Sequence, residues 1–298
     1  MNNLKKRIGV GMYFLRYAHK CLSILKCGQS EEFEIMMLAH RLEKGLVNSK
    51  PKPQWGEQKA ERLGFLLNRN KQAFSYQTGL AVLHQYLENK RKNPVEQSWV
   101  ENFIKKYKFD TPIVNGGIIR LPKEEISNLN VAEIEKFFLT RHSTRAFADT
   151  QIDEDALEKA ITLAMRCPSA CNRQPYRIYY MDAQQRFEST GSQDKSTASL
   201  YITGIISAFE MSEVLDWIVS PSIFTAYLTL TLHAFGIGSC IYRKDLVCSS
   251  EYNDKVKQAC GIPDNEQLIL ELRIGNYAEE TIVAYSNRLN VKQIIKYI

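Results

Sequence analysis

The sequence has no pair of cysteines spaced C-x-x-C, although seven cysteines occur along its 298 residues. Their number is odd, and neither a histidine nor a carboxylate accompanies the close pair Cys167 and Cys171. A disulfide framework or a zinc ribbon needs paired or metal-spaced cysteines. We therefore expect no metal site, and a reducing, cytoplasmic location.

Long apolar runs are also missing. The N-terminus turns apolar over residues 8–15, but Arg16 and His19 interrupt it well before the roughly 20 residues that a membrane span needs. No small-residue cleavage site follows, so we expect no signal peptide. The formal charge of +6 is modest, and no interleaved basic and aromatic stripe is present. This excludes a nucleic-acid partner and favours at most a small anionic one, such as a phosphate-bearing cofactor.

Apolar residues of the first segment recur at helical spacing with cations beside them. The apolar set is Ile8, Met12, Leu15, Leu22 and Leu25. Such a helix either packs on its own protein, which we favour, or lies on an anionic membrane surface.

The pattern of apolar residues along the chain changes near its middle. Residues 1–110 show mostly helical periodicity, whereas 110–122 contain Pro112, Gly116, Gly117 and Pro122 and predict a linker or a surface-hugging loop. We therefore predict a helical extension over residues 1–120 and a second domain over residues 130–298.

The second domain mixes helices and strands. Helices are predicted at 131–140, 153–166 and 222–235, strands at 177–181, 200–208 and 268–274, and a short helix or extension at 291–298. Because the strands do not alternate regularly with helices, the pattern favours an α+β fold over a doubly wound parallel sheet.

Two arginines with hydroxyl groups between them occur in the sequence Arg141-His-Ser-Thr-Arg145. Guanidinium and hydroxyl donors suit phosphate oxygens, so the segment predicts an anion site. The alternative is a helix C-terminus that carries cations, which is common.

Three further segments carry polar or glycine-rich patterns. The loop from Pro168 to Tyr176 is rich in amide and hydroxyl side chains. These groups suit the edge of a ligand ring on which hydrogen-bond donors and acceptors alternate. The alternative is that they only form hydrogen bonds within the loop. Gly236-Ile-Gly238 follows a predicted helix, whereas the glycine-rich dinucleotide-binding motif follows a strand and has a third glycine. The segment is therefore not that motif, and the alternative is that Gly236 simply ends the helix. Arg288 lies close to the C-terminus.

In this order and at these separations, the segments resemble the nitroreductase family. Arg141-His-Ser-Thr-Arg-Ala-Phe147 fits its first signature, and Pro168 to Tyr176 fits its Pro-Ser-x-x-Asn-x-Gln-Pro-aromatic loop. Softer matches are Gly236 to Ser239, Arg273 to Tyr277 and Ser286-Asn-Arg288. The resemblance covers roughly residues 135–298.

The resemblance implies an α/β/α sandwich with a mostly antiparallel central sheet, FMN as cofactor, NADH or NADPH as reductant, and an intertwined homodimer with the flavin at the interface. The loop residues would approach the flavin of the partner subunit. No catalytic acid is implied. The implied cofactor-binding residues are Arg141, His142, Ser143, Arg145, Ser169, Ala170, Asn172, Gln174, Ile241, Tyr242, Arg243 and Arg288.

The leading functional hypothesis is an FMN-dependent NAD(P)H oxidoreductase acting on a small nitro, quinone, enone or sugar-linked acceptor. A second hypothesis keeps the flavin for another redox step, such as dehydrogenation of a bound intermediate. A third is an accessory or scaffold protein in polysaccharide biosynthesis that the N-terminal helix holds at a membrane surface. The third is motivated by the basic N-terminus and by the short polar stretch 182–200, where the family carries a substrate-shaping insertion. Ser286 also stands where the family often has a lysine.

The helical extension has its own pattern. The segment 39–46 with Trp55-Gly56 resembles a nitroreductase subgroup with a helical extension that is associated with bacterial polysaccharide gene clusters. His40, Glu43 and Lys44 share one helix face. We interpret them as a surface ion pair with a half-buried histidine, and the alternative is a lid that projects into the flavin pocket. Gly45 is predicted to end its helix.

Overall fold

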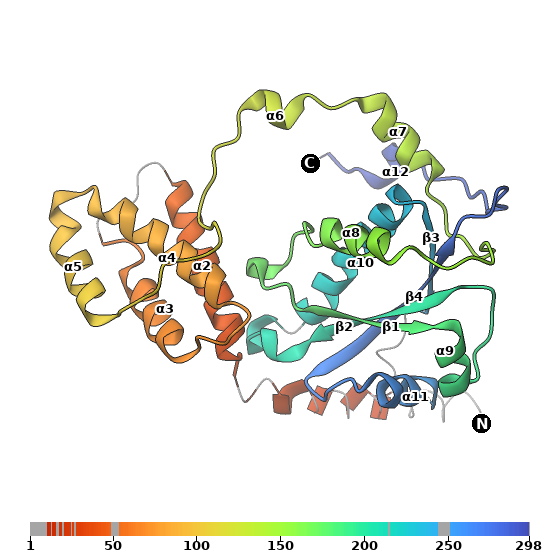
Figure 1. Ribbon diagram of the computed structural model, residues 1–298, viewed down its shortest axis with the longest axis horizontal. Coiled ribbons are helices and arrows are strands. Elements are labelled where there is room, and N and C mark those ends of the chain that lie inside the picture. The colour runs from red at the N-terminus through yellow and green to blue at the C-terminus, as the bar shows by residue number, and fades with distance from the viewer. Residues whose placement is uncertain are drawn as a thin grey trace.

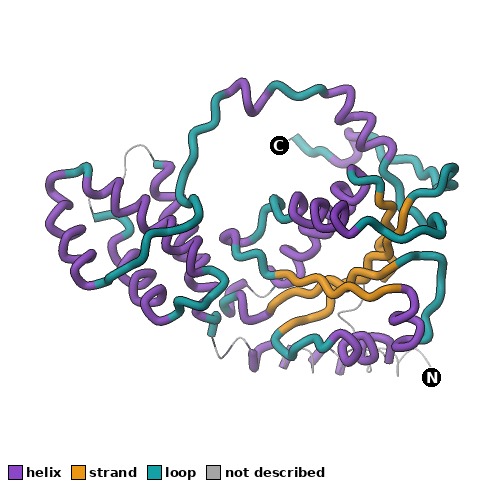
Figure 2. Tube along the Cα trace, viewed as in Figure 1, coloured by secondary structure: helices purple, strands orange, loops and turns teal. Residues whose placement is uncertain are grey.

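The computed structural model describes residues 28–48, 54–213, 215–243 and 251–297, and, from the N-terminal segment, residues 11, 12, 14, 15, 18, 19, 21–24 and 26. The predicted amphipathic helix at the N-terminus therefore lies partly outside the described residues, as do Ile8 and Leu25. Figures 1 and 2 show a helical region on one side and a sheet with its helices on the other.

The N-terminal helical region is a small bundle with its own core. It consists of α2 (Glu31–Val47), α3 (Glu57–Arg69), α4 (Tyr76–Arg91), the 3-10 turn η1 (Pro94–Glu96) and α5 (Gln97–Lys106). Its buried cluster draws on all four helices and includes Ile35 and Leu42 of α2, Leu63 of α3, Tyr86 of α4 and Phe103 of α5. Helical periodicity in this half is confirmed.

Gly45 lies inside α2, which continues to Val47, so the prediction that Gly45 ends the helix is wrong. A Cβ at this position would overlap the ring of Trp55. The glycine is needed for the close approach of the indole, which stacks edge-on against Tyr86 with ring centroids 4.9 Å apart.

Residues 107–130 connect the two parts of the molecule. The part of this segment up to Ile118 lies against the bundle. Gln85 of α4 accepts from the backbone N–H of Ile118 and donates to its carbonyl. The chain then runs outward through α6 (Lys123–Ser127) and α7 (Val131–Thr140), neither of which buries a residue. In Figure 1 this arm arches away from both bodies.

The second part is built on a four-stranded sheet in the order β1-β2-β4-β3. All three pairings are antiparallel. The strands are β1 (Tyr176–Asp182), β2 (Ala198–Ile205), β3 (Ile237–Arg243) and β4 (Glu266–Asn276). The central strands β2 and β4 are buried along nearly their whole length, since helices cover both faces.

Helices α8 (Glu154–Ala164) and α10 (Asp216–Ala234) cover one face of the sheet, and α9 (Ala183–Thr190) and α11 (Glu251–Cys260) lie on the other (Figure 1). The main apolar cluster joins Leu200, Ile202 and Leu272 of the sheet to Phe224 and Leu228 of α10. The α+β fold, with helices on both faces of an antiparallel sheet and a helical N-terminal region, is confirmed.

The face toward α9 and α11 also buries a polar layer. Glu271 of β4 accepts from Ser199 at 2.9 Å, from Tyr252 at 2.8 Å and from Arg273 at 2.9 Å. A buried carboxylate is tolerated because these donors satisfy both of its oxygens.

Several element boundaries differ from the sequence prediction. Strand β2 ends at Ile205 and the chain then forms the turn η3 (Ile206–Ala208), whereas one strand was predicted over 200–208. Helix α10 begins at Asp216, before the predicted start at residue 222, and it contains Pro221 in its second turn. Strand β3 and the helices α9 and α11 were not predicted. Strand β3 begins Ile-Gly-Ser-Cys and shows no clear alternation, and α9 and α11 are short and mostly polar.

The described part of the N-terminal segment lies against the sheet domain, since Cys21 and Ile24 join its apolar cluster. At the other end, the chain leaves β4 as an exposed extension with the short helix α12 (Val291–Ile294), as predicted, and Ile298 lies outside the described residues. Among the described residues, no helix is long and apolar enough to cross a membrane.

Candidate functional site

The arginine motif, residues 141–147, runs along the outer edge of the sheet. Ser143 forms a parallel bridge with Ser239 of β3, and the N–H of Thr144 donates to the Ser239 carbonyl at 2.9 Å. Further along, Ala148 donates to the carbonyl of Asn276 at 3.0 Å. The structure therefore brings together three segments that the sequence singled out separately: the arginine motif, Gly236 to Ser239, and Arg273 to Tyr277.

Two glycines make this contact possible. A Cβ at Gly275 would lie 2.8 Å from the side chain of Phe147, and one at Gly238 would lie 3.1 Å from the Thr144 side chain. Gly236, with φ of 74°, turns the chain from α10 into β3. The interpretation of this glycine as a helix stop is correct, and Gly238 has a separate role in packing.

A histidine network fixes the start of the arginine motif. His233, in the last turn of α10, lies 2.9 Å from the Tyr277 hydroxyl through Nδ1 and 3.0 Å from the Thr140 hydroxyl through Nε2. Burial lowers the pKa of His233, and the nearby charges of Arg141 and His142 lower it further. Burial also raises the pKa of Tyr277. The imidazole and the phenol are therefore both uncharged near pH 7, and the hydrogen bond between them joins two neutral groups.

The cations of the arginine motif lack acidic partners. Arg141 and Arg145 form no ion pair with any residue that the structure describes, and Arg145 reaches only the carbonyl of Ser143, at 3.4 Å. Ser143 and Arg145 are exposed, and Arg141 and His142 are partly exposed. A set of available guanidinium, imidazole and hydroxyl donors on a rigid sheet edge fits the phosphate and ring edge of FMN.

The proline-bracketed loop, residues 168–175, has an unusual backbone. Cys171, Asn172 and Gln174 all have φ near +50° although none is glycine. Such conformations cost about 1–3 kcal/mol each, and they persist only where the surroundings hold them. The loop contains the turn η2 (Ala170–Asn172), and Ser169 accepts from the Gln174 N–H at 3.1 Å.

Arg173 is the residue that holds this loop, and the sequence analysis did not single it out. Its buried guanidinium donates to both oxygens of Glu213, at 2.8 and 2.5 Å, and to the carbonyl of Ala208 at 2.8 Å. It also stacks over the Phe209 ring. Glu213 belongs to the turn η4 (Met211–Glu213), far along the chain, so no local pattern could have revealed the pair.

The two signature segments lie at opposite ends of α10. The loop contacts its N-terminal part, where the N–H of Ala170 donates to the Ser220 hydroxyl at 3.4 Å. The arginine motif adjoins its C-terminal end through His233. At 1.5 Å per residue, the stretch from Ser220 to His233 is about 20 Å long. One chain therefore does not bring Arg145 and Asn172 to the same point.

The remaining predicted site residues lie on strand β3 and on the C-terminal extension. Ile241 and Tyr242 of β3 are exposed, and the Tyr242 ring lies 3.5 Å from the Arg273 guanidinium, which belongs to the polar layer. The side chain of Arg243 lies outside the described part of the chain. Arg288 is exposed on the C-terminal extension, where it donates to the Ser286 carbonyl at 2.7 Å.

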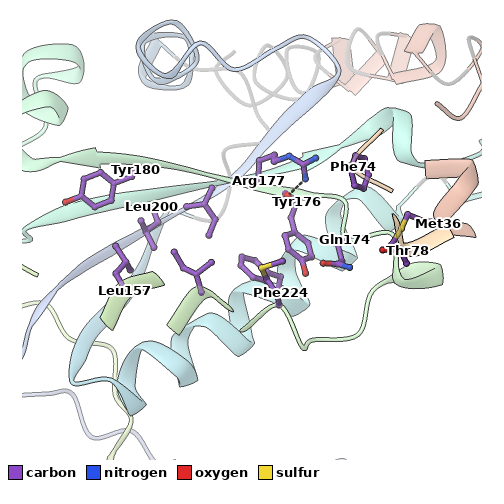
Figure 3. Close-up of a pocket in the computed structure, with 13 residues that line it drawn as sticks. Met36, Phe74, Thr78, Leu157, Gln174, Tyr176, Arg177, Tyr180, Leu200 and Phe224 are labelled. Atoms are coloured by element: carbon purple, nitrogen blue, oxygen red, sulfur yellow. Dashed lines mark hydrogen bonds between the residues drawn. The ribbon is translucent and has the colours of Figure 1, made fainter. Parts of the chain in front are cut away.

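A pocket of about 660 Å³ lies between the helical region and the sheet domain. The helical region contributes Met36 of α2 and Thr78 of α4, and the sheet domain contributes Ile161, Ile178 and Gln174. Figure 3 shows Gln174 beside Thr78 and Met36 at one end of the pocket. The lining is otherwise mostly apolar, so the amide of Gln174 gives that end a polar character.

His40 and Glu43 form the expected ion pair on α2, with Nδ1 and Oε2 3.2 Å apart and both side chains partly buried. Lys44 is exposed. Among the described residues, no cluster of histidine, cysteine or carboxylate side chains is arranged to hold a metal ion.

Comparison with known proteins supports the family resemblance. Residues 139–201 match the sequence model of the Nitroreductase family. The matched segment contains the arginine motif, α8, the proline-bracketed loop and β1. This part of the chain is therefore nitroreductase-like in sequence.

One curated relative, from Archaeoglobus fulgidus, carries a provisional name as an NADH dehydrogenase/NAD(P)H nitroreductase. It is 26% identical over 157 residues, which cover 50% of this chain and 87% of the relative. Similar solved structures include a nitroreductase family protein from Clostridium novyi, with 22% identity, 49% and 85% of the two chains covered and a TM-score of 0.42. Another is an FMN-dependent nitroreductase from Clostridium difficile, with 19% identity, 54% and 96% coverage and a TM-score of 0.45.

Proposed function

We propose that this chain is an FMN-dependent oxidoreductase that passes electrons from NADH or NADPH to a small organic acceptor. The observation that carries the proposal is the set of unpaired cations at Arg141 and Arg145, which the pairing of Ser143 with Ser239 holds at a rigid sheet edge. Cations grouped at one place raise the local concentration of anions, and their donors stay available to one. The nitroreductase match over residues 139–201 supports FMN as that anion.

The residues of the arginine motif would hold the cofactor. Arg141, His142, Ser143 and Arg145 supply donors to its phosphate, ribityl chain and ring edge, and Arg288 adds a second cation for the phosphate. When bound, FMN supplies the two-electron chemistry that no side chain can perform. The positive charge of Arg145 would favour the electron-rich form of the ring.

We further propose that the site is completed by a second copy of the chain. Because the loop lies about 20 Å from the arginine motif along α10, Ser169, Ala170, Asn172 and Gln174 reach a flavin only if they come from another subunit. The exposed apolar side chains of α7 also support this assembly, since Phe138 and Leu139 are 57% and 68% exposed. A helix with such a face normally packs against a partner.

The strand beyond Gly238 would border the reactive face of the ring. Ile241 and Tyr242 are exposed there, and Arg243 follows them at the end of β3. The stacking of Tyr242 on Arg273 restrains the tyrosine, so that it positions a substrate without moving itself. The acceptor is of the nitro, quinone, enone or sugar-linked class.

The visible absorption spectrum of the purified protein tests the cofactor, with the released chromophore identified after denaturation. We expect a flavin spectrum with about one FMN per subunit, and bleaching of that spectrum on anaerobic addition of NADH or NADPH. A colourless protein that does not take up added FMN contradicts the proposal and favours a scaffold role. Bound FMN that neither nucleotide reduces favours the other flavin reaction, dehydrogenation of a bound intermediate.

Light scattering during size-exclusion chromatography tests the assembly. We expect the mass of two chains. Mixing two full-length variants tests the shared site more directly: Arg145→Ala and a loop variant, Asn172→Ala, are each deficient alone. In a shared site, co-expression should restore part of the FMN binding, because one of the two sites in a mixed dimer is then intact. No restoration would contradict a composite site.

A further inference from the structure

The pocket between the helical region and the sheet domain has one polar end and one apolar end. Its volume of about 660 Å³ lies in the range of ligand pockets, about 300–1,000 Å³. Figure 3 shows Gln174 and Thr78 at one end, and Leu157 and Leu200 toward the other. A ligand that fits both ends therefore has an apolar part and a polar part.

The walls of this pocket are formed before any ligand binds. The rings of Tyr176 and Phe224 are stacked with centroids 4.1 Å apart, and the Tyr176 hydroxyl lies 3.6 Å from the buried sulfur of Cys167. Two other lining side chains, Phe74 and Tyr180, are 50% and 49% exposed. A rigid wall lowers the cost of binding, and the exposed rings offer apolar surface that a ligand can cover.

Arg177 places a cation at the rim of the pocket. It belongs to β1, the edge strand of the sheet, and is exposed between Tyr176 and Ile178. Its guanidinium lies 5.8 Å from the centroid of the Phe74 ring, and Nη1 donates to the Tyr176 carbonyl at 2.7 Å. Arg177 forms no ion pair with any residue that the structure describes. Its other donors are therefore available to an anion.

We propose that this pocket binds an amphiphilic anion, a molecule with one apolar chain and one carboxylate or phosphate group. The chain lies against Leu157 and Leu200, and the anionic group binds to Arg177. The inference does not rest on the proposed function, because all of these contacts lie within one chain and need no flavin. It gives the helical region a role of its own, since Thr78 and Phe74 close one side of the site.

Two separate forces support this class of ligand. Apolar side chains favour a chain in proportion to the area that they remove from water. A guanidinium offers a planar fork of donors that matches carboxylate and phosphate oxygens. Because the two contributions come from different residues, each can be removed by its own substitution.

Isothermal titration calorimetry of the full-length protein tests the inference. The probes are hexanoate, octanoate and decanoate, with octanol as the neutral counterpart of octanoate and octyl phosphate as the second kind of anion. Arg177→Ala and Arg177→Lys change the cation. Thr78→Trp and Ile178→Trp narrow the pocket from its two sides, so that one variant remains if the other does not fold. The matched control is Arg91→Ala, an exposed arginine that lines a different pocket, on the helical bundle.

We expect a single bound ligand per chain, with affinity that rises about three- to fourfold for each added methylene. Arg177→Ala should weaken octanoate about tenfold or more, while octanol stays within about twofold. Arg177→Lys should recover part of the affinity, and Arg91→Ala should behave as wild type. Either tryptophan variant should weaken octanoate and octanol together. Tighter binding of octyl phosphate than of octanoate identifies a phosphate group, and the reverse identifies a carboxylate.

Three outcomes overturn the inference. In the first, the wild-type protein binds none of the probes. In the second, the folded tryptophan variants bind octanoate as well as wild type does, which would place the ligand elsewhere. In the third, Arg177→Ala leaves octanoate unchanged or weakens octanol equally, so that the arginine does not hold the anion. Whether the protein contains FMN does not affect these readings, so a failure of the proposed function is seen separately.

Discussion

Arg173 and Glu213 form a bidentate ion pair that anchors the strained loop, residues 168–175. The guanidinium is fully buried and the carboxylate is partly exposed. The pair joins the loop to η4, and through Ala208 it also joins the loop to the start of α2. The position of Asn172 therefore depends in part on contacts between residues that are distant in the sequence.

Removal of the carboxylate should loosen this loop. Glu213→Ala leaves the buried Arg173 without a counter-charge, and we expect a loss of about 1–3 kcal/mol in the free energy of unfolding, because the exposed side of Glu213 limits the effect. Urea denaturation measures the change. The control is Glu251→Ala, whose pair with Lys255 lies on the surface, and it should cause no measurable loss. Equal stability of the two variants would contradict the anchoring role.

The same pair predicts a response to acid. The hydrogen bonds from Arg173 lower the pKa of Glu213 below its ordinary value of 4.5. A carboxyl group with a depressed pKa contributes stability above the unfolded pKa and loses it as the pH falls through the folded pKa. Wild type should therefore lose more stability than Glu213→Gln below about pH 4.5. Parallel curves for the two proteins, from thermal melts at a series of pH values, would argue against this linkage.

His233 predicts a second response at milder pH. Because burial and the charges of Arg141 and His142 lower its pKa below 6.5, the unfolded chain binds a proton that the folded protein excludes. Stability should thus rise with pH through the region just below 6.5 and level off above it. His233→Gln should abolish that slope. The measurement is the free energy of unfolding at several pH values between about 5 and 8, and a slope that survives the substitution would show that another group causes it.

Gly275 predicts a steric effect at the arginine motif. In Gly275→Ala the new Cβ would lie 2.8 Å from Phe147, so the motif must shift away from β4. We expect a loss of about 1–3 kcal/mol in stability and weaker retention of FMN. The matched control is Gly11→Ala, where a Cβ meets nothing within 4 Å. Wild-type behaviour of Gly275→Ala would mean that the close packing is not required.

Arg145 predicts a direct effect on the cofactor. Arg145→Ala removes a charge-assisted contact worth about 1.5–3 kcal/mol, so the affinity for FMN should fall roughly ten- to hundredfold. Fluorescence titration of the apoprotein with FMN measures the affinity. An exposed arginine of the connecting segment, Arg120, provides the control in Arg120→Ala. Unchanged FMN affinity in Arg145→Ala would place the phosphate elsewhere.

Local features of the sequence predicted local features of the fold. Helices 131–140 and 153–166 were predicted from periodicity and end signals, and the structure has α7 and α8 there, with Asn130 and Asp153 as N-caps. The strands over 177–181 and 268–274 were also found, each slightly longer than predicted. These signals depend on neighbours within a few residues, so the sequence carries them directly.

The relative positions of the site residues could not be predicted in this way. Arg173 and Glu213 pair only because the fold brings η4 to the loop, and the pairing of Ser143 with Ser239 depends on the open edge of β3. The arginine motif and the loop are close in sequence yet lie at opposite ends of one helix.

The sequence by itself determined which residue types are available: the arginines and hydroxyl groups of residues 141–145, the amide-rich loop and the glycines at positions 236, 238 and 275. The tertiary structure alone decided which of them meet, because chain direction and sheet order are set by burial of apolar faces across the whole molecule. It also decided that α2, from a region without any cofactor signature, lies beside the loop.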